Sequence, residues 1–243
     1  MHLGEKRITK ITAYWGVKSA QDFLNYMEKR VGTEHTLKRI KSPSYFYSMK
    51  YGSFKKRVSL YEEYIGSVEV THRLRISLGG FHWGNVGEIR DFIEYITEYF
   101  GGGENAKEAV KQMMRNSLRA FSEAKKAEME KFVQYLEEYM GDGEKAKEAV
   151  QQMMRSNLQA FSTAKKTEVE KTIKYIENII GKNKVKQKMK RSFQGFTILK
   201  QFQLEQLEQE WGRDVLRTIL TQYNLKYLSD QILQRQCMRG FQL

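Results

Sequence analysis

Positively charged side chains recur at two places around a repeated phenylalanine. A cation stands six residues before it, and a second cation or an asparagine stands four residues after it. Lys and Arg neutralise phosphates, so equally spaced cations can follow a nucleic-acid backbone. The predicted nucleic-acid-binding residues are Arg75, Arg115, Arg155 and Lys190 in the first row, and Lys50, Asn85, Lys125, Lys165 and Lys200, with the adjoining Lys126 and Lys166, in the second.

Residue types that could support catalysis do not combine into a site. The four histidines show neither an HExxH pattern nor the spacing of metal ligands, and one cysteine, Cys237, cannot build a zinc site. No GxxxxGK[ST] phosphate loop occurs, and the glycines of GGGEN (101–105) follow no predicted strand. The sequence therefore predicts a protein that is not an enzyme and that uses no metal, cofactor or small-molecule substrate.

The repeated phenylalanine and a glycine 20 residues later define the elements that carry these cations. Between the two, apolar residues recur at offsets 8, 12, 15 and 19 from the phenylalanine. This spacing predicts a long α-helix with one buried face, and glycine just past its end is a common C-cap. Similar helices are predicted before Gly32 and Gly212. The phenylalanine and glycine pairs are Phe46/Gly66, Phe81/Gly101, Phe121/Gly141 and Phe161/Gly181.

Residues 101–140 and 141–180 are two copies of one segment, identical at 24 of 40 positions. Shorter helices are predicted between each glycine and the next phenylalanine, at 68–76, 106–115, 146–155 and 185–191. Such helix–turn–helix repeats bury their apolar faces by stacking on their neighbours. The sequence therefore predicts an all-α fold, a right- or left-handed α-solenoid with a period of about 35 residues and two repeats of 40.

We expect one helical-repeat domain over 1–243. Residues 1–32 form an N-terminal capping helix, residues 33–212 form five repeats, and residues 213–243 form a divergent C-terminal cap. In this cap Tyr227 stands where the next aromatic residue is expected.

The segments KSPSYF (41–46), ISLGGF (76–81) and NSLRAF (116–121) lie between a short and a long predicted helix that ends in glycine. In this order of elements the chain resembles the mitochondrial transcription termination factors over about residues 17–230. Pro43 matches the proline of that family's turn, and Leu78 and Leu118 stand in its place in later copies. The resemblance implies a curved, basic-lined superhelix that binds double-stranded DNA, or sometimes RNA. Repeats of the TAL-effector kind are a more distant likeness.

Composition narrows the class of partner. With 42 Lys and Arg against 29 Asp and Glu, the formal net charge is +13, and residues 181–200 carry seven cations and no acid. Such a balance favours an acidic partner. No apolar stretch is long enough to cross a membrane, and the single cysteine favours a reducing intracellular compartment. Mitochondrion, nucleoid and bacterial cytoplasm are not distinguished.

Together these patterns predict a monomer that binds nucleic acid along a concave basic edge. Duplex DNA is favoured, and RNA remains open. Tyr47, His82 and Trp83 follow a phenylalanine near this edge and could stack on a base or sugar. The alternative is a protein–protein interaction scaffold of the HEAT or tetratricopeptide kind.

Overall fold

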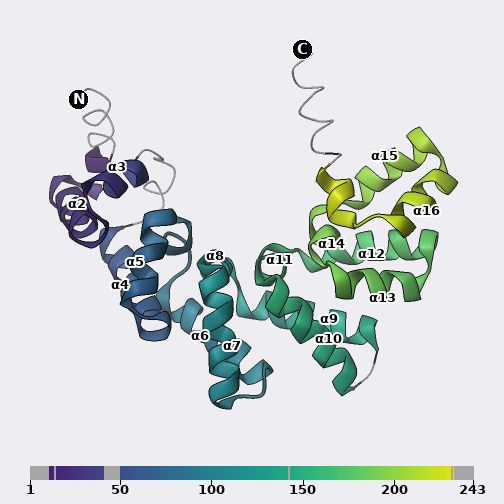
Figure 1. Ribbon diagram of the computed structural model, residues 1–243, viewed down its shortest axis with the longest axis horizontal. Coiled ribbons are helices and arrows are strands. Elements are labelled where there is room, and N and C mark those ends of the chain that lie inside the picture. Colours follow the sequence, from purple (N-terminus) through teal and green to yellow (C-terminus); the bar gives the residue numbers. More distant parts are fainter. Residues whose placement is uncertain (1–10, 14, 41–49, 142, 231, 233–243) are drawn as a thin grey trace, which may run out of the picture. The chain divides into compact units, whose positions relative to one another are not determined.

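The computed structural model describes residues 11–13, 15–40, 50–141, 143–230 and 232, and within these ranges it is helical without a strand (Figure 1). The all-α helical-repeat fold is thus confirmed. Contacts divide the chain into two compact units, 1–126 and 127–243. The predicted residues Pro43, Phe46, Tyr47 and Cys237 lie outside the described residues.

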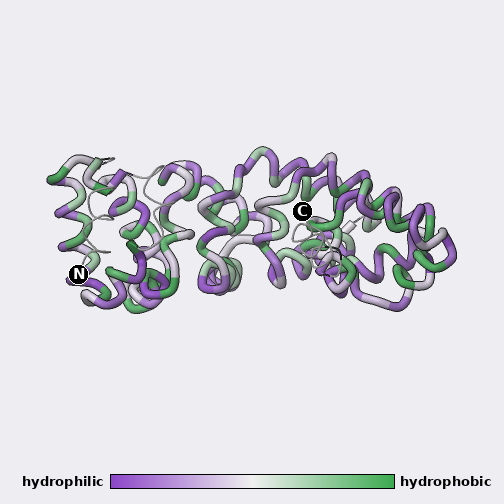
Figure 2. The backbone as a smooth tube through the Cα atoms, turned by 90° about the horizontal axis from the view of Figure 1, so that it is seen from above, coloured by the Kyte–Doolittle hydropathy of each residue, from purple (hydrophilic) through white to green (hydrophobic). Residues whose placement is uncertain are grey.

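Each repeat contains one helix of 11–15 residues that precedes a glycine, here called its long helix. Its buried face follows the predicted spacing: in α4, for example, Phe54, Val58 and Tyr61 are buried completely. Figure 2 shows the resulting mixture of hydrophobic and hydrophilic residues along each helix. The long helices are α2 (Val17–Val31), α4 (Tyr51–Ile65), α6 (Val86–Tyr99), α9 (Lys126–Met140), α12 (Lys166–Ile180) and α15 (Gln201–Trp211).

A single glycine ends most long helices and begins the next short helix. Gly66 has φ +81°, a conformation that side chains with a Cβ rarely adopt. Its N–H donates to Glu62 O at 3.1 Å, and its carbonyl accepts from Val70 N at 3.1 Å, so it belongs to both helices. The short helices are α3 (Thr33–Ile40), α5 (Ser67–Ile76), α7 (Gly103–Asn116), α10 (Glu144–Ser156), α13 (Lys182–Arg191) and α16 (Arg213–Gln222).

The expected turn around each phenylalanine is itself a short helical segment. Ser117 Oγ and Asn157 Oδ1 cap two of these segments, each accepting from a backbone N–H at 3.2 Å. We call the repeated phenylalanine of each turn its anchor. The side chain of the residue after the anchor donates to the carbonyl three residues before it, as Ser122 Oγ does to Arg119 O at 3.1 Å. His82, Ser162, Thr197 and Ser229 repeat this bond. The segments are η2 (Gly79–Phe81), α8 (Leu118–Glu123), α11 (Leu158–Thr163) and α14 (Gln194–Ile198).

This pattern corrects the expected register near the C-terminus. Tyr227 is 53% exposed, whereas Leu228 is buried at 4%. Asn224 caps the helical segment that starts at residue 225, and Ser229 makes the bond of the residue after the anchor, to Lys226 O at 2.7 Å. The anchor position is therefore occupied by Leu228, and residues 213–230 form the short helix and the one-turn segment of a further repeat.

Within each unit, equivalent elements of successive repeats pack against each other. Long helices pair as α2 with α4, α4 with α6, and α12 with α15, while short helices pair as α3 with α5 and α10 with α13. The one-turn segments pair as η2 with α8 and α11 with α14. The one-turn segments pack against the long helices through aromatic rings. The ring centres of Phe92 in α6 and Phe121 in α8 lie 5.5 Å apart, and those of Phe132 in α9 and Phe161 in α11 lie 5.7 Å apart. The start of one long helix is thereby held beside the start of the next.

Candidate nucleic-acid interface

The lysines of the second predicted row stand at the starts of long helices. Lys50, Lys165 and Lys200 are the N-cap residues of α4, α12 and α15, and each has an extended backbone with φ between −90° and −106°. Lys125 directly precedes α9. Asn85 holds the same place before α6. The position four residues after the anchor is therefore the N-cap of the long helix.

Asn85 shows what this position normally does for a helix. Its Oδ1 accepts from Glu88 N at 2.8 Å, while its own N–H donates to a carboxylate oxygen of Glu88 at 3.3 Å. An ammonium group cannot accept such a bond, and Lys50, Lys165 and Lys200 make no side-chain cap. A cation at a helix N-terminus also opposes the helix dipole, at a cost of about 0.3–1 kcal/mol. Helix stability therefore does not explain these lysines.

The two adjoining lysines occupy the first position of their helices. Lys126 begins α9, and Lys166 begins α12. The Lys166 ammonium lies 5.5 Å from the centre of the Tyr135 ring, a cation–π contact within the second unit. Lys200 Nζ lies 3.7 Å from Glu168 in the first turn of α12, which shows that the starts of α12 and α15 are neighbours.

The first predicted row lies at the ends of the short helices. Arg75, Arg115, Arg155 and Lys190 occupy the last turns of α5, α7, α10 and α13. Cations there complement the helix dipole, so the fold itself benefits from them. Arg115 also pairs with Glu108 on its own helix at 3.0 Å. These four residues therefore have a structural explanation that the N-cap lysines lack.

A groove in the first unit brings Lys50 and Asn85 together. Its volume is about 600 Å³, and its other lining side chains include Lys56 and Trp83. No carboxylate belongs to its lining, although charged residues of both signs are frequent elsewhere on the chain. We call this depression the Trp83 groove.

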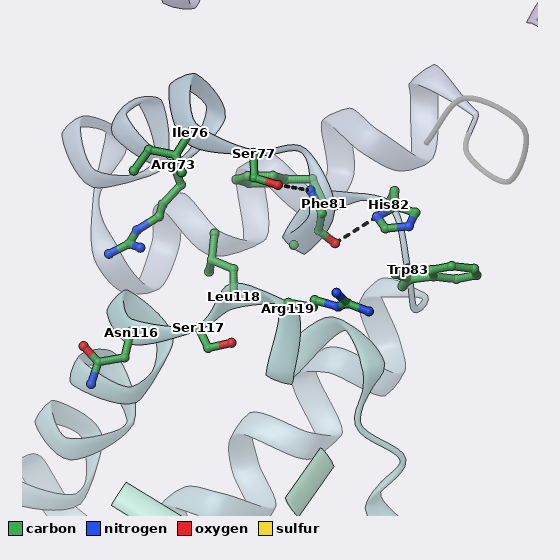
Figure 3. Close-up of a pocket in the computed structure, with 12 residues that line it drawn as sticks. Arg73, Ile76, Ser77, Phe81, His82, Trp83, Asn116, Ser117, Leu118 and Arg119 are labelled. Carbon is green, nitrogen blue, oxygen red and sulfur yellow. Dashed lines mark hydrogen bonds between the residues drawn. The ribbon is translucent and has the colours of Figure 1, made fainter. Parts of the chain in front are cut away.

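A second groove of about 490 Å³ shares His82 and Trp83 with the Trp83 groove (Figure 3). Its two arginines each have an acidic partner on the same helix. Arg73 Nε lies 2.6 Å from Glu69, and Arg119 Nε lies 2.7 Å from Glu123. Both arginines of the second groove are thus ion-paired, whereas Lys50 and Lys56 of the Trp83 groove form no ion pair with the residues that the structure describes.

His82 and Trp83, both predicted as stacking residues, differ in their availability. His82 is buried at 7%, and its Nδ1–H donates to Gly79 O at 2.8 Å. Burial lowers the pKa of His82, so the ring is neutral at physiological pH. Trp83 is 45% exposed and lies against His82 with the ring centres 4.5 Å apart. Trp83 alone of the pair presents an open ring.

Several other cations bind backbone carbonyls of neighbouring repeats. Lys186 Nζ donates to Met140 O at 2.9 Å, and Lys188 Nζ donates to Tyr223 O at 2.9 Å. Arg213 and Arg217 donate to carbonyls at the end of α12. Two lysines of the basic segment 181–200 therefore serve the fold, and net charge alone overstates the charge available to a partner.

Among the residues that the structure describes, no cluster of His, Cys, Asp and Glu could hold a metal ion. None of the described helices combines the length and apolar character needed to span a membrane. Comparison with protein-family models, curated proteins and solved structures finds no match. The resemblance to transcription termination factors stays a prediction.

Proposed function

We propose that this chain binds nucleic acid through the phosphate backbone, without catalysing a reaction, by means of the lysines at the starts of its long helices. One observation carries the proposal: Lys50, Lys165 and Lys200 stand at the N-caps of long helices, where their side chains make no capping bond and their charge opposes the helix dipole. Binding of an anion would explain why a cation recurs at a position where capping residues are preferred.

The geometry at these helix starts suits phosphate groups. The first N–H groups of a helix lack intrahelical partners and carry partial positive charge. An ammonium group beside them adds a full charge, so a phosphate oxygen can be bound by both. Because the starts of α12 and α15 are neighbours in the second unit, Lys165 and Lys200 can bind phosphates of one strand. Duplex DNA, which the sequence favours, and single strands both offer such a backbone.

The decisive test replaces the three lysines by the residue that caps α6. In the variant Lys50→Asn/Lys165→Asn/Lys200→Asn each helix gains a cap and loses an opposing charge, so stability should rise by about 1 kcal/mol per site. Affinity for nucleic acid should fall, and the slope of log K against log salt should lose up to about 2.7, at about 0.9 per phosphate contact on duplex DNA. Stability and affinity should therefore change in opposite directions.

A matched control removes the same charge elsewhere on the long helices. The exposed residues Lys55, Lys131 and Lys174 are changed together to Gln. This control should keep most of the salt slope. The variant Arg115→Ala/Arg155→Ala tests the first row in the same titration. An N-cap variant that binds duplex and single strands like the parent, with an unchanged salt slope, would contradict the proposal and favour the protein-interaction alternative.

A further inference from the structure

The Trp83 groove differs from the corresponding place in the second unit, where α15 follows α12. Gly84 and Gly87 stand where that repeat has Leu199 and Phe202. Gly84 has φ +69°, and a Cβ there would lie 2.6 Å from Ser122 O, so a side chain is excluded. Both glycines line the groove beside the start of α6, and neither contributes a side chain to it.

The placement of carboxylates also differs: Glu168 and Gln203 of the second unit correspond to Ser53 and Glu88 of the first, and the Glu88 carboxylate accepts from Asn85 N at 3.3 Å. The third residue of α6, α9 and α12 is a glutamate (Glu88, Glu128 and Glu168), whereas in α4 it is Ser53. In the second unit Glu168 lies within 3.7 Å of the Lys200 ammonium. Lys50 and Lys56 in the Trp83 groove face no lining carboxylate, and both are exposed. The groove therefore favours an anionic ligand.

The third difference is the ring. Trp83 replaces Ile198 of the second unit, and the indole is nearly half exposed beside His82. Figure 3 shows the indole pointing away from Ile76 and Asn116, which line the far side of the second groove. A flat aromatic surface beside two phosphate-binding cations is the combination used for single-stranded nucleic acid, where bases stack on rings and the backbone follows positive charge.

We propose that the Trp83 groove binds one unpaired nucleotide of a single strand. The base stacks on Trp83, and the adjoining phosphates lie at Lys50 and Lys56. A volume of about 600 Å³ is within the range of ligand pockets. A base inside a duplex is already stacked on both faces, so this site selects single-stranded or locally unpaired nucleic acid. The inference rests on the proposed function, because Lys50 belongs to both.

The test compares a labelled oligothymidylate of about 12 nucleotides with a duplex of equal length. Trp83→Ala should weaken single-strand binding about 5- to 150-fold, the range expected for loss of one base–aromatic stack, and leave duplex binding within about two-fold. Trp83→Phe should retain most of the affinity because a phenyl ring still stacks. Ile198→Ala, at the same place in the second unit, is the matched control and should change neither.

Ser53→Glu tests the charge without touching the ring. Glu at this position favours the helix start, so the variant should be at least as stable as the parent and still lose single-strand affinity. In a Trp15→Phe/Trp211→Phe background, the only remaining tryptophan is Trp83, and its fluorescence should be quenched by the single strand but not by the duplex. A separate titration uses adenosine monophosphate. If it quenches Trp83 at concentrations as low as those at which the oligonucleotide does, the groove binds a free nucleotide, and the proposal that it binds a nucleotide of a strand is overturned.

The two proposals fail differently. Salt-dependent duplex binding with no effect of Trp83→Ala or Ser53→Glu on the single strand would overturn the nucleotide site alone. Equal losses of affinity for single strand and duplex in the Trp83→Ala variant would also overturn the nucleotide site alone. No binding to any nucleic acid at low salt would overturn both.

Discussion

Gly195 lies where two one-turn segments of the second unit pack most closely. It is buried in α14, and a Cβ placed on it would lie 2.4 Å from Leu225 Cβ and 2.8 Å from two backbone atoms, Leu225 C and Lys226 N. Contacts below 3.0 Å are essentially never found for real Cβ atoms. Because backbone atoms cannot move aside as a flexible side chain would, Gly195→Ala must push two repeats apart.

Overpacking of this kind costs about 1–3 kcal/mol, and the backbone contacts place Gly195→Ala toward the upper end. For a chain of this size each kcal/mol lowers Tm by roughly 2–4 °C. Gly52→Ala is the matched control. Gly52 lies in α4, and its added Cβ would meet nothing within 4 Å. Alanine there should raise the stability of the helix by about 0.5–1 kcal/mol.

Urea denaturation measures both changes, and hydrogen exchange locates them. In the Gly195→Ala variant, amides of α13 (182–191), α14 (194–198) and the segment 225–230 should exchange faster, because repeat arrays transmit a loss mainly to adjacent repeats. If Gly195→Ala unfolds at the same urea concentration as Gly52→Ala, the close packing between one-turn segments is not a determinant of stability.

Three further predictions concern the first unit. Phe121→Ala removes a completely buried anchor and should cost about 3–5 kcal/mol, with faster exchange in the adjacent repeats; a uniform change along the chain would argue against repeat packing. Tyr61→Phe should raise stability by about 1 kcal/mol in urea unfolding, because the buried Tyr61 hydroxyl has no hydrogen-bond partner among the described residues; a clear loss would mean that the hydroxyl is bonded. Burial lowers the pKa of folded His82, so below its ordinary value of about 6.5 the unfolded state binds more protons, and stability falls as pH falls. His82→Ser should reduce this loss of folding stability between about pH 7 and pH 5, measured by urea unfolding at several pH values. An unchanged pH dependence of stability would refute the role of His82.

The long helices were predictable because their apolar residues keep one spacing and a glycine marks each end. A fifth buried position, nine residues before that glycine, was missed. Phe23, Phe92 and Phe132 occupy it in three helices, but Arg57 and Thr172 occupy it in two others and hide the pattern. In the structure both polar side chains bind the next turn: Arg57 donates to Gly84 O at 2.7 Å, and Thr172 donates to Leu199 O at 3.0 Å. Tertiary hydrogen bonds of this kind have no local signal.

The candidate interface was predictable only as a set of recurring cations. Capping preferences do not predict lysine at an N-cap, so the sequence placed Lys50 beside a turn without showing that it is the N-cap residue of α4. The Trp83 groove was out of reach because its lining comes from two repeats, from the start of α4 and from residues 82–87, which lie together only in the folded chain. The anchor was misplaced at Tyr227 for a simpler reason: the buried anchor position is occupied by Leu228 and not by an aromatic residue. Asn224, which caps this segment, is the residue from which the register could have been recognised.

The hydrogen bond from the residue after each anchor closes its turn locally, without a side chain from another repeat. Ser122 and Ser162 both make it, although Arg119 and Gln159, whose carbonyls accept it, carry different side chains. A duplicated segment can therefore keep its turn intact while its surface residues diverge. The near-identity of 101–140 and 141–180 is consistent with evolution by duplication of whole repeats, in which each added copy brings its own closed turn, stacks on its neighbours and offers a new N-cap position for selection to change.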